Sequence, residues 1–315
     1  MSRLILIYFL YLLLCNFVQG TDNPTKNITE VEKKLEIRSN LDGRIVNGTE
    51  AFLGQFPQQV SLRRSWSGTH FCGGNIIHPK WILTAAHCMY LDYVEIKPWT
   101  IKVVAGNVLL QGSSRTNEER NVQKIIIHED FKYDTLENDI ALLELKFPFF
   151  PNKAVQIAKI PTKRTKAQTL CQVSGWGYLN ENRRIVSNEL MFIDLPILST
   201  KKCRELLHEV SLVPDGMFCA GYEEGLKDSC QGDSGGGLVC NGILTGVVSG
   251  GQGCARPGLP GLYTDVYFYR KWIKSAISNM DVSNYLYRNS GSSHFLNIFW
   301  LVSLSLSAFL LTMYC

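Results

Sequence analysis

The sequence predicts an all-β, antiparallel protein with one helix near the end of its folded region. Between Ile45 and about Asp265, short apolar or alternating runs follow one another, separated by glycine, proline and polar clusters. This spacing is typical of antiparallel sheets, because alternating strand-helix units would need longer amphipathic helices between the strands. Apolar residues then repeat at helical spacing within Val266 to Ile277, namely Tyr269, Trp272, Ile273 and Ala276.

The expected strands are the apolar or alternating runs themselves. Each is short enough for a strand and is followed by residues that favour turns. In chain order they include Gln59 to Leu62, Trp81 to Thr84, Ile101 to Ala105, Ile140 to Leu145, Glu189 to Leu195 and Ile243 to Val248.

Composition and charge narrow the class of protein. The 315 residues are 45% hydrophobic and 19% charged, which fits a globular chain and argues against global disorder. The formal net charge is only +4, and Lys and Arg are scattered. We therefore expect no nucleic-acid partner and no polybasic membrane surface.

The start of the chain predicts export. Met1-Ser2-Arg3 and the apolar run Leu4 to Leu14 are typical of a secretory signal, residues 1–20, cleaved after Val18-Gln19-Gly20. The alternative is an uncleaved signal anchor. Residues 21–44 are polar and carry a glycosylation sequon at Asn27, so we interpret them as a pro-segment; a leader with no processing role is the alternative.

The end of the chain predicts a membrane tether. Residues 45–280 would hold the folded domain, 281–294 a polar linker, and 295–315 an almost wholly apolar tail with no charge after it. Small residues before such a tail favour a glycosylphosphatidylinositol (GPI) attachment signal. A single membrane helix is the alternative. Either would hold the protein outside the cell.

The cysteines indicate disulfides. Eight of the ten lie between Cys15 in the signal and Cys315 at the end, and an even set in an exported domain favours disulfide bonds. Zinc binding is disfavoured because the chain has no pair of close CxxC elements and no suitably spaced histidines.

Three motifs together offer the groups needed for nucleophilic acyl transfer, which are an activated hydroxyl, a base and a carboxylate that orients the base. Gly232-Asp233-Ser234-Gly235-Gly236 places a serine in a backbone that can turn tightly. Thr84-Ala85-Ala86-His87-Cys88 follows an apolar strand, and Asn138-Asp139 opens another. Each motif alone could be a turn, a structural histidine or a strand cap.

In combination, and in the chain order His, Asp, Ser, these motifs resemble the trypsin and chymotrypsin family of serine proteases across Ile45 to Ile277. The resemblance implies two packed six-stranded antiparallel Greek-key barrels with the active site between them. It also implies that Ser234 attacks the peptide carbonyl, His87 transfers the proton and Asp139 orients His87. The N–H groups of Gly232 and Ser234 would form the oxyanion hole, and Ser249 would support Asp139.

The resemblance further implies four disulfides that leave no domain cysteine unpaired. No cysteine lies in 21–44, so the pro-segment would leave after cleavage and the catalytic domain would be a free, single-chain monomer. The implied pairs are Cys72 with Cys88, Cys171 with Cys240, Cys203 with Cys219, and Cys230 with Cys254.

Activation follows from the junction Arg44-Ile45-Val46-Asn47-Gly48, which looks like the family's cleavage site. An activating protease cutting after Arg44 would create an ammonium on Ile45, and Asp233 would be its partner. A buried carboxylate is costly until that ammonium exists, so cleavage can act as a switch.

Specificity is expected to depend on Asp228, at the bottom of the primary pocket in the resemblance, beside Ser229. A buried carboxylate there calls for protein or peptide substrates with Arg or Lys at the cleaved bond. Gly251 and Gly261 at the pocket walls leave room for such side chains, and Ser249 to Gly251 would pair with the substrate. The alternative for Asp228 is a solvated loop acid.

The sequence departs from the family at several positions. Gly250 replaces a usual Trp and leaves the outer subsites undefined, and Gly237 replaces a usual Pro, which loosens the chain after Ser234. We expect no cofactor and no metal; calcium stays open because Asn107 replaces an acid although Glu118 and Glu119 lie further on. Asn47 forms a second sequon beside the cleavage site.

Two other functions stay possible: a non-catalytic protease homologue acting as a binding module, and a membrane-displayed regulator that differs from a digestive enzyme only in substrate. All three triad residues are present, which favours an enzyme. The remaining histidines match no catalytic position and are expected in surface or packing roles: His70, His78, His128, His208 and His294.

Overall fold

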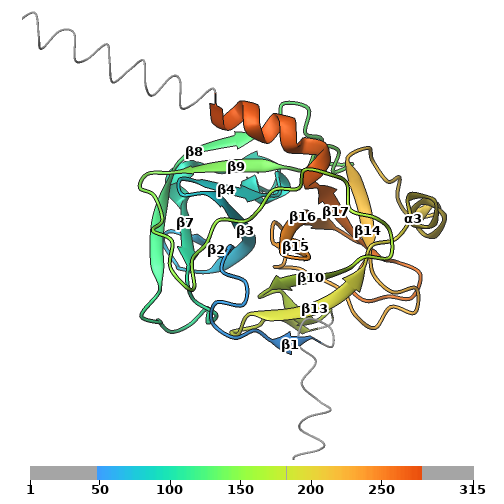
Figure 1. Ribbon diagram of the computed structural model, residues 1–315, viewed down its shortest axis with the longest axis horizontal. Helices are drawn as coiled ribbons and strands as arrows, with labels where there is room; N and C mark the ends of the chain where they lie inside the picture. Colours follow the sequence, from blue (N-terminus) through green and yellow to red (C-terminus); the bar gives the residue numbers. More distant parts are fainter. Residues whose placement is uncertain (1–47, 182, 279–315) are drawn as a thin grey trace, which may run out of the picture. The chain divides into compact units, whose positions relative to one another are not determined.

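Two groups of antiparallel strands form the fold in the computed structural model, which describes residues 48–181 and 183–278 (Figure 1). The predicted signal, pro-segment, cleavage junction, both sequon asparagines, polar linker and apolar tail lie outside these residues. Within the described ranges, no helix has the length and hydropathy needed to cross a membrane.

The first group closes into a six-stranded barrel. Its strands bury apolar side chains such as Val60, Leu62, Ile82 and Leu83, which are all fully buried. Every residue of its strand β9 is buried, which agrees with the continuous apolar run in the sequence. Around the barrel the order is β2 (Gln59–Arg64), β3 (His70–His78), β4 (Trp81–Thr84), β9 (Ala141–Leu145), β8 (Glu118–Ile127) and β7 (Ile101–Ala105).

The second group is a seven-stranded sheet, and the expected second closed barrel is only partly confirmed. Its strands β13 and β14 meet through one isolated bridge, Ile197 to Ala220, instead of a full ladder. The physical reason is that β13 ends at Pro196, which has no N–H to donate to a neighbouring strand. The order is β1 (Thr49–Glu50), β13 (Met191–Pro196), β10 (Leu170–Gly175), β15 (Gly237–Cys240), β16 (Ile243–Gly250), β17 (Gly261–Asp265) and β14 (Met217–Ala220).

Each of the six predicted runs overlaps a strand, and these strands are β2, β4, β7, β9, β13 and β16. Residues 266–278 are helical, so the predicted helix is confirmed as far as the structure describes it. Its residues Tyr269 and Ile273 are buried in the same apolar cluster as side chains of the barrel strands. The sequence did not predict the short elements β5 (Tyr90–Leu91), β6 (Val94–Glu95), β11 (Tyr178–Asn180), β12 (Arg183–Val186), η1 (His87–Met89), η2 (Pro98–Thr100) and α3 (Thr200–Leu207).

Four disulfides cross-link the described chain, and they join the four pairs that the resemblance implies. Cys72–Cys88 ties β3 to η1, and Cys171–Cys240 ties β10 to β15. Cys203–Cys219 ties α3 to β14, and Cys230–Cys254 joins two loops of the second group. Such a framework is typical of proteins folded in an oxidising compartment.

Gly237, for which the sequence predicts a looser chain after Ser234, packs closely against β3. A Cβ atom at Gly237 would lie 2.2 Å from Oδ1 of Asn75, a fully buried side chain of β3. The Asn75 amide donates to the Gly235 carbonyl at 3.2 Å, which fixes Asn75 against the turn before β15. Glycine at 237 therefore fits the space that Asn75 leaves.

Replacing Gly237 with Ala should lower the free energy of unfolding by about 1–3 kcal/mol, because the added methyl overpacks the contact with Asn75. Chemical denaturation with the disulfides intact measures this loss. In an Asn75→Ala background the same substitution should cost less, and an equal cost in both backgrounds would refute the contact as its cause.

Candidate active site

The first barrel brings His87 and Asp139 together through one strand pair. Thr84 at the end of β4 lies opposite Ala141 at the start of β9, so the segments that follow β4 and precede β9 meet. His87 Nδ1 donates to Asp139 Oδ2 at 2.8 Å, and the His87 backbone N–H donates to Oδ1 at 2.8 Å. Both carboxylate oxygens are thereby held by one residue.

The second group of strands completes the environment of Asp139, which is fully buried. Ser249 Oγ, on β16, donates to Asp139 Oδ2 at 2.5 Å. Thr264 Oγ1, on β17, donates to the Asp139 backbone carbonyl at 2.8 Å. Ser249 and the two donors of His87 thus satisfy a carboxylate that would otherwise be costly to bury.

The His87 imidazole is partly open, with a side chain 20% exposed. Burial disfavours its protonated form, but the charge of Asp139 and their hydrogen bond outweigh this effect and raise the pKa of His87. Because Nδ1 donates to Asp139, Nε2 is the nitrogen free to accept a proton in the neutral ring.

Ser234 lies in the turn before β15, which packs against β3 and the end of β4. The Gly73 N–H donates to the Ser234 carbonyl at 2.7 Å, and a Cβ at Gly235 would lie 2.2 Å from Thr84 Oγ1. Gly235 has a φ of +78°, which favours glycine. Among the hydrogen bonds of the described chain, none joins Ser234 Oγ to His87; such bonds often shorten only when substrate binds.

A buried histidine, His70, supports the loop before Ser234. His70 Nε2 donates to the Gly232 carbonyl at 2.9 Å, and its Nδ1 accepts from Ser61 Oγ at 2.9 Å. Burial lowers the pKa of His70 to about 4, so the ring is neutral. The sequence predicted only a surface or packing role for His70, and the structure adds a hydrogen bond to the loop before Ser234. Its contact with Gly232 spans 162 positions, so no sequence pattern indicates it.

Asp233 is fully buried under the same loop. Its carboxylate accepts from the Gly177 N–H at 2.7 Å and the Cys230 N–H at 2.8 Å. Burial nevertheless raises the pKa of Asp233 from 3.8 to about 6. No Lys, Arg or His of the described chain forms an ion pair with it.

Asp228 lies in a small cavity of about 120 Å³ that Ser234, Ser249 and Gly251 also line. The Ala255 N–H donates to Asp228 Oδ2 at 3.1 Å, whereas the buried Oδ1 has no partner within the described ranges. Burial raises the pKa of Asp228 to about 7. A Cβ at Gly261 would lie 2.8 Å from this Oδ1, so a side chain there would crowd the carboxylate.

The cavity has a second polar wall. Ser229 Oγ lies 3.2 Å from the hydroxyl of Tyr263, a buried residue of β17. This hydrogen bond places the predicted substrate-binding serine beside Asp228 and joins it to the sheet.

Comparison with known proteins agrees with this geometry. The family model Trypsin matches residues 45–273. The chain belongs to the trypsin family. It is 40% identical over 258 residues to human "Serine protease 1", covering 81% of this chain and 98% of that protein. It is 41% identical over 240 residues to "Trypsin-1" of Salmo salar (76% and 93% covered) and 40% over 237 residues to "Trypsin-1" of Astacus astacus (73% and 99%).

This membership makes the protein a serine endopeptidase, a hydrolase. The loop that raised the question of calcium in this trypsin-family chain is held by its own contacts. Asn107 donates to the Gly112 carbonyl at 3.1 Å, Glu118 pairs with Arg120, and Glu119 pairs with Lys102 at 2.8 Å. The acids suggested as ligands are therefore already paired with cations.

The His87 pKa can be measured by NMR titration of its imidazole in the Ser234→Ala variant. We expect a value above 6.5, because the effect of Asp139 exceeds that of burial. In a double variant that also carries Asp139→Asn, the carboxylate charge is lost and the pKa should fall. A His87 pKa that does not change with Asp139→Asn would contradict this account.

Proposed function

We propose that this protein is a trypsin-like zymogen whose active form cleaves peptide bonds after Arg or Lys through an acyl-enzyme. The observation that carries the proposal is Asp228, a buried carboxylate with one unpartnered oxygen in the cavity that Ser234 also lines. A guanidinium or ammonium group of the substrate would complete its hydrogen bonding and offset the cost of its burial.

The proposed reaction has two stages. Ser234 Oγ attacks the peptide carbonyl carbon while His87 Nε2 takes the hydroxyl proton, and the N–H groups of Gly232 and Ser234 stabilise the oxyanion. His87 then gives the proton to the leaving amine, and the C–N bond breaks to leave an acyl-Ser234. Water, deprotonated by His87, hydrolyses this ester, while Asp139 keeps the imidazole in one tautomer.

His70 enters this scheme as a positioning residue. Its bond to the Gly232 carbonyl fixes the peptide plane before Asp233. The N–H of Gly232 belongs to the proposed oxyanion hole, and its φ of +99° is one that glycine adopts readily. The proposed hole therefore depends on a contact between the two strand groups.

Activation by cleavage after Arg44 is supported by the state of Asp233. An isolated buried carboxylate with a pKa of about 6 destabilises the fold at neutral pH, because the unfolded group binds its proton more weakly. The new Ile45 ammonium would reverse this penalty by pairing with Asp233. An activating protease is thus a required partner.

Export and tethering complete the proposal. The four disulfides favour an oxidising compartment, in agreement with a signal over 1–20 and a glycan at Asn27. The tail 295–315 would place the monomeric enzyme on the outer cell surface through a GPI anchor. Release by a phosphatidylinositol-specific phospholipase C would distinguish this anchor from a membrane helix.

The function is tested by cleaving the protein at Arg44 and assaying chromogenic Arg, Lys, Phe and Ala amides. Arg and Lys amides should be hydrolysed, and Ser234→Ala should abolish the activity. Asp228→Ser should lower kcat/KM on the Arg amide by roughly two orders of magnitude or more, because one charge-assisted pair is lost. Silence on all four amides would favour the binding-module alternative; an unchanged rate in Asp228→Ser would refute the pocket assignment.

The switch is tested by comparing the unfolding free energy of cleaved and uncleaved protein from pH 4 to 7. The pKa of Asp233 in the folded protein lies above its unfolded value of 3.8. The contribution of Asp233 to the unfolding free energy of the uncleaved form therefore falls as pH rises through about 6, by about 3 kcal/mol in all. Pairing with Ile45 should remove this fall.

Protease-treated Arg44→Gln protein is the matched control and should behave as the uncleaved form. Parallel pH profiles for cleaved and uncleaved protein would exclude Asp233 as the partner of the new ammonium.

A further inference from the structure

The loop 147–151, which follows β9 and has the sequence Phe-Pro-Phe-Phe-Pro, presents two phenylalanines to water. Phe147 is 64% exposed and Phe150 is 68% exposed. Phe149, between them, is only 2% exposed, and its N–H donates to the Pro79 carbonyl at 2.8 Å. One ring therefore anchors the loop on the barrel, and the rings on either side of it remain in contact with water.

Arg120 of β8 holds this loop in shape. Its Nε donates to the Pro148 carbonyl at 2.8 Å, and its guanidinium lies over the Phe149 ring, 4.9 Å from the ring centre. The two prolines of the loop fix φ at their positions. The exposed rings are thus ordered in advance, so a partner that binds them need not order the loop first.

The charges around the loop suit a surface that carries phosphate groups. Lys146 and Lys153 flank the loop, both are exposed, and neither forms a salt bridge with a described residue. Glu118, which accepts from Asn152 at 3.3 Å, is already paired with Arg120. Lysine side chains can keep their ammonium groups among lipid headgroups while neighbouring apolar groups insert. Exposed aromatic rings between lysines are typical of segments that lie in a membrane interface.

The proposed tether would keep this loop near a bilayer. The apolar tail 295–315 follows the final helix after the 16 residues 279–294, which span at most about 58 Å when fully extended. The helix packs beside the end of β8 through the stacking of Trp272 on His128, and Arg120 lies near the other end of β8 (Figure 1). Because the ten residues of β8 cover only about 34 Å, the loop can reach the surface that holds the tail.

We propose that Phe147 and Phe150 insert into the headgroup region of the outer leaflet and dock the protease domain on the membrane. This inference rests on the tether in the proposed function, which makes docking intramolecular and raises the effective concentration of lipid at the loop. A single myristoyl chain gives only marginal membrane binding, so two rings need the tether. Together, the rings and the tether determine which face of the domain meets the lipid.

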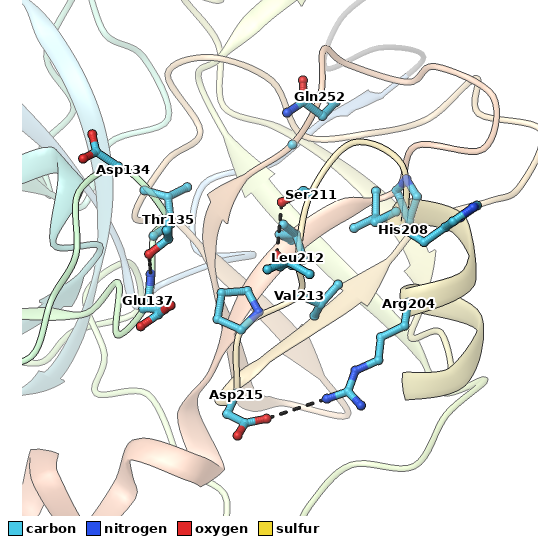
Figure 2. Close-up of a pocket in the computed structure, with 16 residues that line it drawn as sticks. Asp134, Thr135, Glu137, Arg204, His208, Ser211, Leu212, Val213, Asp215 and Gln252 are labelled. Carbon is cyan, nitrogen blue, oxygen red and sulfur yellow. Dashed lines mark hydrogen bonds and ion pairs between the residues drawn. The ribbon is translucent and has the colours of Figure 1, made fainter.

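Docking through this loop leaves the candidate active site open. Asp139 precedes the start of β9 and the loop follows its end, so the length of the strand separates them. A cavity of about 800 Å³ shares Gly251 with the cavity that contains Asp228, and Figure 2 shows it between the segments 134–137 and 211–215. No loop residue is among the described residues that line either cavity. Substrates can therefore approach while the domain is docked.

The test uses the full-length protein, purified with its anchor and reconstituted into phosphatidylcholine vesicles, where flotation with the vesicles reports the tether. Phe147→Trp adds a fluorophore to the loop, and its emission is obtained by subtracting that of the unsubstituted protein. Bromine on the lipid acyl chains quenches an indole only by contact. The added emission should therefore fall by roughly twofold or more in brominated vesicles, because the ring reaches the boundary between headgroups and acyl chains.

Phe52→Trp is the matched control, because Phe52 is 70% exposed and lies next to β1 in the second group of strands. Its added emission should be equal in brominated and unbrominated vesicles. Phe150→Asp, combined with Phe147→Trp, should remove most of the quenching, because a charged side chain is costly to insert into lipid. The substituted side chains are all exposed, so the variants should fold, which thermal unfolding checks.

Flotation without quenching in Phe147→Trp would overturn the docking and leave the tether intact. Quenching that survives Phe150→Asp, or that is equal in Phe52→Trp, would also overturn it. A blue shift without quenching that grows with the protein-to-lipid ratio would indicate a second copy of the chain as the partner, and would exclude lipid. Failure to float would instead contradict the tether in the proposed function, and the docking with it.

Discussion

The buried carboxylate of Asp139 is the constraint on which the rest of the site depends. Its two oxygens accept from the side chain and backbone of His87 and from Ser249, which belong to different strand groups. A carboxylate removed from water needs all of these donors, so the two groups must meet at one place for the fold to be stable. The proposed catalytic geometry is therefore also a condition of folding.

Two other buried acids differ from Asp139. Asp228 lacks a full set of hydrogen-bond donors, and Asp233 has two donors but no cationic partner among the described residues. Asp228 has an unpartnered oxygen, and burial raises the pKa of both Asp228 and Asp233. Each carries a cost that a positive group can offset. The proposed substrate would supply that group to Asp228, and the proposed new terminus to Asp233, so that substrate selection and activation use the same physical effect.

Much of the fold and of the candidate site could be predicted from local sequence. The run Ile140 to Leu145 predicted the buried strand β9, and the motif around Ser234 predicted a glycine-dependent turn, because strand periodicity and positive φ are properties of neighbouring residues. The family resemblance placed His87, Asp139, Ser234 and Asp228, since motif order and spacing identify them without coordinates. The same information could not show that the second sheet remains incompletely closed after Pro196.

The remaining features arise from contacts between distant segments. His70 meets Gly232 across 162 positions, and Asn75 meets Gly237 across the two strand groups, so neither role can be recognised from neighbouring residues. Gly250 was recognisable in the sequence as a missing side chain, but its close approach to Leu136 of another segment was not. Composition and motifs determined the class of fold and the candidate chemistry. Tertiary packing decided which polar groups are buried, which are partnered and which space stays open, because burial depends on segments that only folding brings together.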